Sequence, residues 1–339
     1  MKNDNTAPAL TSIETLPPMM ELLSELRAGL ATYWNIATDI LQECEVTVVQ
    51  PTENDFSSSK NFFSLLFLYS FYSAGIRPER RILYSAVLQC LRGMVTGCDN
   101  LLDNEYKMTL NTDIPQTGHR FRSVIDIMIS DRVLFRLLFD AGAQGDIDRE
   151  KISLASAVSM KSMTKSGIQE ASEETGVEKI LVPDSILSTV HHFKTGVLFT
   201  CPWDIPEVIE KIEPSQVKTM KKALYAIGMG CQIMDDIVDI GSDISMKRHN
   251  YLVSHIFHGD CEKERRRLQE YLRLPRQGEQ QDGAFSDFPR SVALACATAK
   301  DFLHSGLSGL FRDDHSFLIS PAMEFFQRRI GVDFERAAE

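Results

Sequence analysis

Four aspartates lie within nine positions of a segment that is otherwise apolar. The stretch reads CQIMDDIVDIGSD over residues 231–243 and contains Asp235, Asp236, Asp239 and Asp243. Residues three and four apart share one face of a helix, so these carboxylates are expected to lie close together. They repel one another unless a cation joins them, and an all-oxygen ligand set favours Mg²⁺ over zinc. A solvated acidic face is the alternative, but the intervening residues are too apolar for a free surface.

A second acidic pair lies much earlier in the chain. In GCDNLLDNE, residues 97–105, Asp99 and Asp103 are four apart, which again places both on one helical face. Mg²⁺ seldom occupies a cage made by protein alone and shares its coordination shell with water and substrate phosphates. The two stretches together predict a metal cluster whose ligand is a phosphorylated or diphosphorylated molecule.

A lysine beside a glycine supplies the opposite charge. The stretch HHFKTGVLF places Lys194 two residues before Gly196. Glycine inside a helix costs about 1 kcal/mol relative to alanine, so we expect a local break that lets the ammonium and backbone groups approach an anionic ligand. The adjacent His191 and His192 have no acid or cysteine at a spacing typical of a metal site. We interpret them as structural or lining residues.

The composition is that of an ordinary globular protein. The 339 residues are 43% hydrophobic, which is enough for a sizeable core, and the formal net charge of -11 argues against general nucleic-acid binding. Seven scattered cysteines without a CxxC pair indicate reduced thiols in a cytoplasmic protein. The N-terminus lacks the apolar region of a secretory signal, and the most apolar run, residues 62–75, is too short to span a bilayer.

Apolar residues recur at helical spacing along nearly the whole chain, and β-branched alternation is scarce. We therefore expect an all-α fold with one domain over residues 19–339, after a disordered or extended tail over residues 1–18. The polar, glycine-rich residues 274–289 predict a mobile loop, and a break is expected between Pro202 and Pro206. The expected helices are 19–47, 60–75, 79–106, 119–141, 148–172, 184–198, 214–241, 248–258, 261–273, 290–309 and 316–330.

Three motifs together carry a family resemblance. DNLLD at 99–103, KTG at 194–196 and QIMDD-IVD at 232–239 resemble, in order and spacing, the trans-isoprenyl diphosphate synthases and their class I terpene synthase relatives. The resemblance covers roughly residues 58–250. It implies an all-α, single-domain helical bundle of the isoprenoid synthase type around a deep apolar cavity, usually as a homodimer. It also implies that three Mg²⁺ ions hold an allylic prenyl diphosphate, which loses diphosphate to leave an allylic cation.

The resemblance implies roles for the acidic residues. Asp99 and Asp103 resemble the metal ligands of the first motif, and Asp235 and Asp239 resemble those of the second. Asp236 resembles a metal residue of the outer shell, or one that contacts a metal-bound water. These five positions would together form the metal site of a class I isoprenoid enzyme.

The resemblance also implies contacts with the substrate. Lys194 and Thr195 resemble residues that contact the allylic diphosphate, and Gln232 resembles a glutamine that faces the developing cation. Lys247 resembles the basic residue after the second motif, although the intervening loop is about two residues shorter than the family pattern. Each of these positions is therefore a candidate catalytic or substrate-binding residue.

The expected site for isopentenyl diphosphate departs from the family pattern. The family's GGKRxRP-like segment corresponds to SSKNFFSL, which keeps Lys60 but has Asn61 and Phe63 in place of arginines. In the first motif itself, Asn100 replaces an aspartate and is a weaker, neutral ligand. A diphosphate needs several cationic or amide donors, so this second pocket is predicted to be degenerate.

The stretch after the first motif also has fewer basic residues than the family pattern. Two arginines are usual there, but EYKMTLNT offers a single basic residue, Lys107. Arg77, Arg80 and Arg81 in GIRPERR are candidate replacements for the missing arginines. Lys60 and Lys107 are the basic residues that the expected isopentenyl diphosphate site keeps.

Three functions remain open on this basis. A prenyltransferase would join an allylic diphosphate to isopentenyl diphosphate or another acceptor, and the intact KTG and QIMDD-IVD elements favour it. A terpene synthase on the same scaffold would quench the cation internally, and the missing arginines favour it. A regulatory subunit of a heteromeric synthase is the third, but such subunits tend to lose the aspartates that this chain keeps.

The helix before the first motif is expected to form the cavity floor. Family members with short products often carry aromatic residues four and five positions before the first aspartate, whereas this chain has Val95 and Met94 there. Gly93 and Gly97 beside them are expected to free side-chain volume, so the pocket should accept an allylic chain of C15 or longer. The alternative is that this face merely packs against a neighbouring helix. The expected lining residues are Leu88, Leu91, Met94 and Val95.

Overall fold

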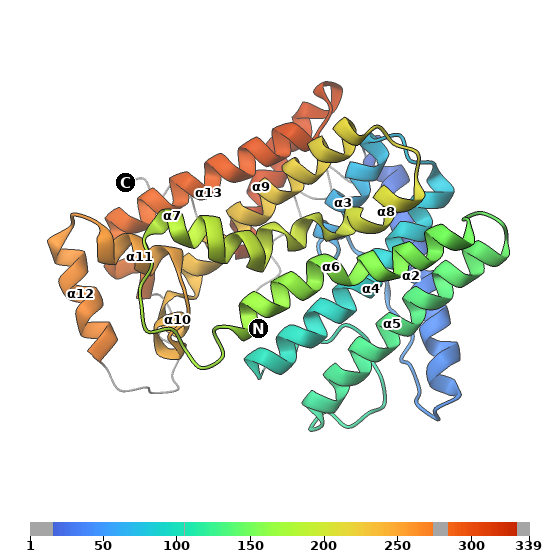
Figure 1. Ribbon diagram of the computed structural model, residues 1–339, viewed down its shortest axis with the longest axis horizontal. Helices are drawn as coiled ribbons and strands as arrows, with labels where there is room; N and C mark the ends of the chain where they lie inside the picture. The colour runs from blue at the N-terminus through green and yellow to red at the C-terminus, as the bar shows by residue number, and fades with distance from the viewer. Residues whose placement is uncertain (1–15, 105, 274–283, 331–339) are drawn as a thin grey trace. The chain divides into compact units, whose positions relative to one another are not determined.

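The computed structural model describes residues 16–104, 106–273 and 284–330, and these form an all-α protein (Figure 1). Within these ranges, β-type pairing is confined to an isolated bridge between Val48 and Thr112. The α-helices are α2 Met19–Gln42, α3 Phe62–Ser73, α4 Pro78–Asp103, α5 His119–Ala143, α6 Arg149–Ala171, α7 Pro183–Ser185, α8 Asp204–Ile209, α9 Pro214–Val238, α10 Ile240–Met246, α11 Tyr251–His258, α12 Glu262–Arg273, α13 Pro289–Leu310 and α14 Ile319–Ile330. A π-helix covers Ile186–Gly196, and 3-10 helices cover Glu53–Phe56, Leu198–Trp203, Ala284–Asp287 and Asp313–Leu318. The predicted fold class is confirmed.

The chain divides into two compact units. Unit 1 comprises Met1–Met163 with Cys201–Met220, and unit 2 comprises Thr164–Thr200 with Lys221–Glu339. The first acidic motif belongs to unit 1, whereas the KTG segment and the second acidic motif belong to unit 2. The single domain expected from the sequence stays a prediction.

In unit 1, α4 carries the first acidic motif in its last turns. Pro78 at the first helical turn suits a helix start, because its fixed φ matches the helix and its missing N–H would have no partner there. The helix ends at Asn104, which adopts the left-handed conformation with φ 52°. These two signals set a helix of 26 residues that places Asp99 and Asp103 near its end.

Small residues bring α4 close to α5. A side chain at Gly93 would collide with Ser130, and one at Gly97 would collide with Ile127, both on α5. The sequence suggested that these two glycines free volume for a substrate chain, and that suggestion is wrong. Their space is already filled by the neighbouring helix, so they set a close helix crossing.

In unit 2, α9 and α13 run side by side (Figure 1). Gly230 on α9 lies against Leu303, and Gly306 on α13 lies against Ile227, so each helix has a gap that the other fills. Helix α9 ends at Val238, and α10 begins after Asp239, whereas the sequence predicted one helix over 214–241. The interruption falls on the last aspartate of the second motif.

Two predicted irregular segments contain helical turns. The segment from Pro202 to Pro206, where a break was expected, belongs to the 3-10 helix Leu198–Trp203 and to α8. Trp203, between the two, is fully buried, and its Nε1 donates to Ser70 Oγ at 2.9 Å. Of the loop expected at 274–289, residues 274–283 lie outside the described residues, and Ala284–Asp287 form a 3-10 helix. Of the expected tail, residues 1–15 also lie outside them.

Candidate active site

The first acidic motif presents two aspartates and buries the asparagine between them. Asp99 and Asp103 are partly exposed, whereas Asn100 is 2% exposed. Asn100 Nδ2 donates to the carbonyl of Lys107 at 3.0 Å, and the Lys107 N–H donates to Asn100 Oδ1 at 2.8 Å. Asn100 therefore ties the segment after α4 back to the helix, and the Lys107 side chain is left exposed.

The second acidic motif has the same pattern of exposure. Asp235 and Asp239 are exposed, whereas Asp236 is 2% exposed. The Asp239 N–H donates to the Asp235 carbonyl at 2.8 Å, so the helical spacing continues across the end of α9. The carboxylates of Asp235 and Asp239 are thus placed one turn apart on the accessible side.

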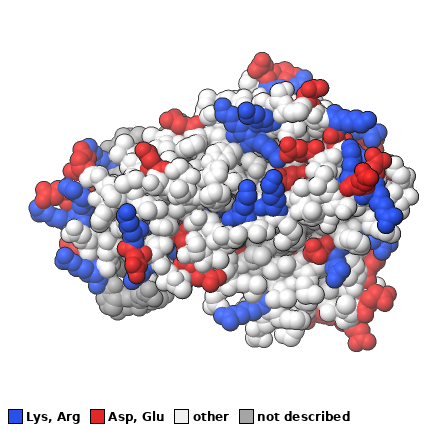
Figure 2. All heavy atoms as spheres, in the orientation of Figure 1, with Lys and Arg blue, Asp and Glu red and all other residues white. Residues whose placement is uncertain are grey.

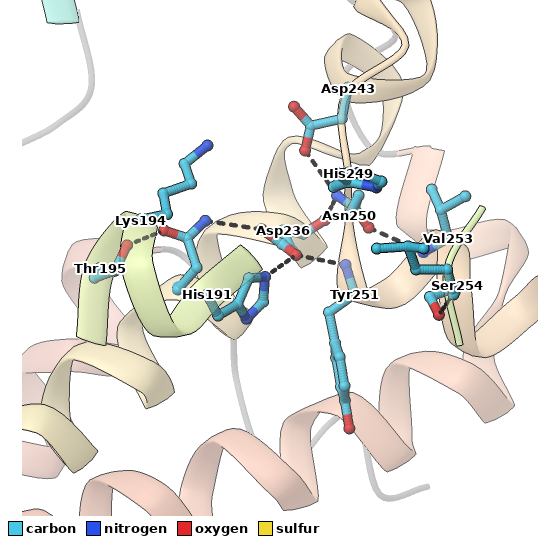
Figure 3. A network of polar contacts seen from close by, with 12 residues as sticks. His191, Lys194, Thr195, Asp236, Asp243, His249, Asn250, Tyr251, Val253 and Ser254 are labelled. Carbon is cyan, nitrogen blue, oxygen red and sulfur yellow. Dashed lines mark hydrogen bonds and ion pairs between the residues drawn. The ribbon is translucent and has the colours of Figure 1, made fainter. Parts of the chain in front are cut away.

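Asp236 lies at the centre of a buried hydrogen-bond network (Figure 3). His191 Nε2 lies 2.9 Å from Asp236 Oδ2, Gln232 Nε2 donates to Oδ1 at 2.9 Å, and the Tyr251 N–H donates to Oδ2. Burial favours a raised pKa for Asp236, but His191, the Tyr251 N–H and Gln232 lower it below its usual value. Both carboxylate oxygens of Asp236 accept from protein donors, and its assignment to the outer shell of the metal site stays a prediction.

The same network links the second motif to the KTG segment. The Thr195 hydroxyl donates to Gln232 Oε1, and the other end of the Gln232 amide donates to Asp236. Gln232 is 8% exposed. The structure therefore brings together three predicted site residues from two separate segments of unit 2, and it fixes the orientation of the Gln232 amide.

The KTG segment forms the end of a π-helix rather than a simple break. The Val197 N–H donates to the His192 carbonyl at 2.8 Å, five residues back, which is the π-helical pattern. A side chain at Gly196 would collide with the Tyr225 ring, so glycine is required there by packing. Wide turns of this kind are frequent at functional sites.

Lys194 faces carboxylates. Its Nζ lies 3.3 Å from Glu170 Oε1 on α6, a residue that the sequence analysis missed. Burial disfavours the ammonium, but Glu170 and the more distant Asp236, Asp243 and Glu173 outweigh this effect and raise the pKa of Lys194. The charged form of Lys194 is therefore favoured beside the second motif.

Asp243, the last aspartate of the stretch, is an acceptor for Asn250. Asn250 Nδ2 donates to Asp243 Oδ2 at 2.8 Å and also to the Asp236 carbonyl at 2.7 Å. Burial, together with the charge of Asp236, raises the pKa of Asp243 to about 8. In Figure 3, Asp243 and Lys194 project to the same side of the network, opposite the Tyr251 ring.

Lys247 ends α10 in the left-handed conformation, with φ 55°. Its carbonyl accepts the Val177 N–H at 2.7 Å, and its side chain is exposed. The backbone of Lys247 thus joins the segment after α6 to the end of α10.

In unit 1, Lys60 and Asn61 of the predicted acceptor site both have partners in the segment just before them. Lys60 Nζ contacts Asp55 Oδ1 at 2.9 Å, and Asn61 Nδ2 donates to the Asp55 and Ser57 carbonyls at 2.9 Å each. Arg92 on α4 donates to Asn61 Oδ1 at 3.2 Å. Arg92 is a cation beside Lys60 that the sequence analysis missed because it lies in a different helix.

Arg80 and Arg81 do not replace the missing arginines. Both are buried, Arg81 Nε donates to Glu25 Oε2 at 2.8 Å, and Arg80 Nε lies 3.5 Å from Glu210 Oε1. Each guanidinium is thus neutralised within the core of unit 1, whereas Arg77 is exposed at the start of α4.

The residues predicted to line a cavity lie on α4. Leu88, Leu91 and Met94 are buried, and Val95 is partly exposed. Leu88 and Val95 fall on the helical face that carries Asp99, whereas Met94 turns toward another face. Their role as a cavity floor stays a prediction.

The donor set suits a metal that is shared with a ligand. No group of three or more His, Cys, Asp and Glu that could hold a metal ion occurs among the described residues. Each acidic motif offers a pair of carboxylates one helical turn apart, which fits the hard oxygen ligands of Mg²⁺ but leaves most of its shell to water or phosphate. The described helices also include none long and apolar enough to cross a membrane.

Comparison with known proteins finds similarity over part of the chain. Residues 142–282 match the family model of the polyprenyl synthetases. A geranylgeranyl diphosphate synthase of Pseudescherichia vulneris is 26% identical over 130 residues, which cover 37% of this chain and 41% of that protein.

Solved structures share the fold over nearly the whole chain. A geranylgeranyl pyrophosphate synthase of Lactobacillus brevis aligns with a TM-score of 0.63 and 15% identity, covering 94% of this chain and 100% of that one. A geranylgeranyl pyrophosphate synthetase of Pyrococcus horikoshii aligns with a TM-score of 0.61 and 17% identity, covering 91% and 98%. Part of the chain is thus similar in sequence to the polyprenyl synthetases, and the chain shares the helical fold of these solved structures.

Proposed function

We propose that this protein is an Mg²⁺-dependent prenyltransferase that ionises an allylic prenyl diphosphate. The observation that carries the proposal is the network in which Thr195 of the KTG segment, Gln232 and Asp236 of the second motif are hydrogen-bonded in series beside Lys194. A buried polar chain of this kind holds its members in fixed positions. The match to the polyprenyl synthetases covers the same segments.

The carboxylate pairs are the proposed metal ligands. Asp235 and Asp239 would hold Mg²⁺ in the second motif, and Asp99 and Asp103 would do so in the first. Three ions are the number that the family resemblance implies. Bound Mg²⁺ neutralises the charge on a diphosphate and so makes it a better leaving group.

The protein's own groups would position the substrate. The Lys194 ammonium would bind the allylic diphosphate, with Lys247 as a further cation, and Thr195 would lie beside the diphosphate while its hydroxyl donates to Gln232. The Gln232 amide, held at both ends, would present a fixed dipole to the developing allylic cation. Gln232 is 8% exposed and so has little contact with solvent.

The acceptor diphosphate is proposed to bind weakly. Lys60 is the family-like cation there, but its ammonium already contacts Asp55, and Asn61 is committed to backbone carbonyls. Lys107 is exposed, and Arg92 lies near Lys60, so these two cations would carry the remaining affinity. Calorimetry with isopentenyl diphosphate tests this directly, and tight, saturable binding would contradict it.

The substrate is proposed to be an allylic diphosphate of C15 or longer, accommodated beside Leu88, Leu91, Met94 and Val95. Val95→Phe tests this proposal, because an added ring finds no room in a close-packed wall except in the cavity. A shorter accepted chain or product is expected. The same chain lengths as in the parent would show that α4 does not form the floor.

A homodimer is proposed on the basis of an apolar stripe along α5. Phe121, Met128, Phe135 and Phe139 are each more than half exposed and recur at helical spacing. Figure 2 shows that the surface at the bottom of the view, over the start of α5, is largely free of charged side chains. Exposed apolar side chains that recur on one helix face are typical of an interaction site. Light scattering should give twice the mass of the chain, and Phe135→Glu should reduce it.

The central experiment is incubation with each allylic diphosphate and Mg²⁺, with and without isopentenyl diphosphate, followed by product analysis. Longer diphosphates that form only with isopentenyl diphosphate support the prenyltransferase. A hydrocarbon or alcohol formed without it indicates a terpene synthase instead. No release of diphosphate from any substrate would overturn the proposed function.

A further inference from the structure

The ion pair between Lys194 and Glu170 has no counterpart among the motifs that the family resemblance rests on. Lys194 Nζ lies 3.3 Å from Glu170 Oε1, and both side chains are only about one-fifth exposed, at 19% and 20%. Glu170 lies in the last turn of α6, and Lys194 lies near the end of the π-helix. One turn before Glu170, Ser166 Oγ donates to the Lys194 carbonyl at 2.6 Å. Two contacts thus fix α6 against the segment that carries Lys194.

The other carboxylates around Lys194 already serve different donors. Glu173 accepts from Gln169 Nε2 at 3.0 Å and from the His249 N–H at 2.9 Å. Asp236 accepts from its own network, and Asp243 accepts from Asn250. Glu170 is therefore the carboxylate positioned to neutralise the Lys194 ammonium at contact distance.

We propose that Glu170 is a positioning residue that acts as an internal competitor, holding Lys194 while the site is empty and recapturing it as diphosphate leaves. The inference rests on the proposed function, because it takes Lys194 to be a diphosphate contact. A diphosphate can bind Lys194 fully only after the ion pair between Lys194 and Glu170 is weakened. The apparent affinity of the protein for diphosphate is therefore lower when a larger fraction of Lys194 is paired with Glu170. The negative charge of Glu170 also repels the incoming anion at short range.

This competition predicts a particular pattern for Glu170→Gln. The amide keeps the size of the side chain and an oxygen acceptor for Lys194, but it removes the competing charge. Inorganic diphosphate should then bind about tenfold more tightly, which corresponds to one unit of log Kd. Turnover should fall if product release becomes slower, while KM for the allylic diphosphate also falls. A merely structural role would instead raise KM or leave it unchanged while lowering kcat.

The control is Glu174→Gln. Glu174 lies four residues further along the chain and is exposed, so the same loss of charge occurs away from Lys194. Its affinity for diphosphate should stay within twofold of wild type. Glu170→Asp withdraws the carboxylate by one methylene and should give a smaller increase of the same sign, which keeps the test informative if Glu170→Gln does not fold.

The experiment is calorimetry of the full chain with inorganic diphosphate and excess Mg²⁺, for wild type, the three glutamate variants, Lys194→Ala and the double variant Glu170→Gln/Lys194→Ala. Tighter binding by Glu170→Gln that disappears in the Lys194→Ala background supports the inference. Unchanged or weaker binding by Glu170→Gln overturns it while leaving the proposed function intact, provided that Lys194→Ala binds diphosphate weakly. If Lys194→Ala binds as wild type does, the diphosphate role of Lys194 is wrong and the inference is overturned with it.

Discussion

Asn100 and Asp236 occupy equivalent places in the two acidic motifs, each directly after the first aspartate and each 2% exposed. Asn100 exchanges two hydrogen bonds with the backbone of Lys107. Asp236 accepts the Tyr251 N–H, and its own carbonyl accepts from Asn250. In both motifs, then, the buried residue ties the acidic helix to the segment that follows it.

The difference between the two residues is their charge. Asn100 is neutral and is satisfied by two groups of the backbone. Asp236 is ionised, and a buried charge is tolerated only with several partners, which here include His191 and Gln232. We therefore expect Asn100 to have a structural role rather than that of a weakened metal ligand, because both ends of its amide are bonded to the backbone of Lys107.

The largest effect is expected from replacing Asp236, the charged residue that joins α9 to the segment after it. Asp236→Ala leaves His191 and the Tyr251 N–H buried without their acceptor, and loss of one partner of a buried pair costs about 3–5 kcal/mol. Urea denaturation would measure this loss. Asp235→Ala, one residue earlier and exposed, is the matched control and should cost less than about 1 kcal/mol. Equal losses from the two variants would contradict the division between buried and accessible aspartates.

The accessible aspartates should affect turnover instead. Asp235→Ala and Asp99→Ala each remove a proposed metal ligand, and we expect turnover to fall by about 10²–10³-fold, or about 2.7–4 kcal/mol. Release of diphosphate from farnesyl diphosphate in the presence of Mg²⁺ is the measurement. Near-wild-type turnover in Asp235→Ala would show that the metal assignment of the second motif is wrong.

A second buried carboxyl, that of Asp126, shows how hydrogen-bond partners affect the pKa. Asp126 on α5 is as buried as Asp236, but its Oδ2 has no hydrogen-bond partner among the described residues. Burial raises the pKa of Asp126 to about 7, against the smaller opposing effects of Thr109 and Arg122, whereas partners lower the pKa of Asp236. The pKa values of two equally buried carboxyls are thus shifted in opposite directions, because only Asp236 has several partners that favour the charged form.

The raised pKa of Asp126 makes the stability of the protein depend on pH. The folded state binds the Asp126 proton more tightly than the unfolded state does, so this group's contribution to stability is lost as the pH rises from about 4 to about 7. Between pH 5 and 8 the loss should be about 2–3 kcal/mol. Asp126→Asn should remove it, and denaturation curves at both pH values would test this. An Asn variant that keeps the wild-type pH slope would rule Asp126 out as its source.

The smallest effect is expected from replacing Asn100, the neutral residue that joins α4 to the segment after it. Asn100→Ala leaves the Lys107 N–H and carbonyl without their partner, which should cost about 1–2 kcal/mol of stability. Asn100→Asp should not raise turnover, because an aspartate at this buried position would lose the donor to Lys107 rather than gain a metal. Higher turnover in Asn100→Asp would restore the interpretation of Asn100 as a weakened ligand.

Much of the fold was predictable because helical periodicity is a local property. The apolar spacing located α4, α5 and α13 to within a few residues, and the spacing of Asp99 from Asp103 and of Asp235 from Asp239 placed each pair on one helical face. These predictions required only neighbouring residues. The family resemblance rested on the same short-range patterns.

What the sequence by itself determined, therefore, is the set of helices and the types of group that each face carries. Only the tertiary structure decided which of the adjacent Asp235 and Asp236 is buried, because that depends on which side of α9 the His191 and Tyr251 segments cover. It also decided that Glu170 contacts Lys194 and that Gly93 accommodates α5. Partners of this kind lie far apart in the chain, and packing alone brings them within contact distance.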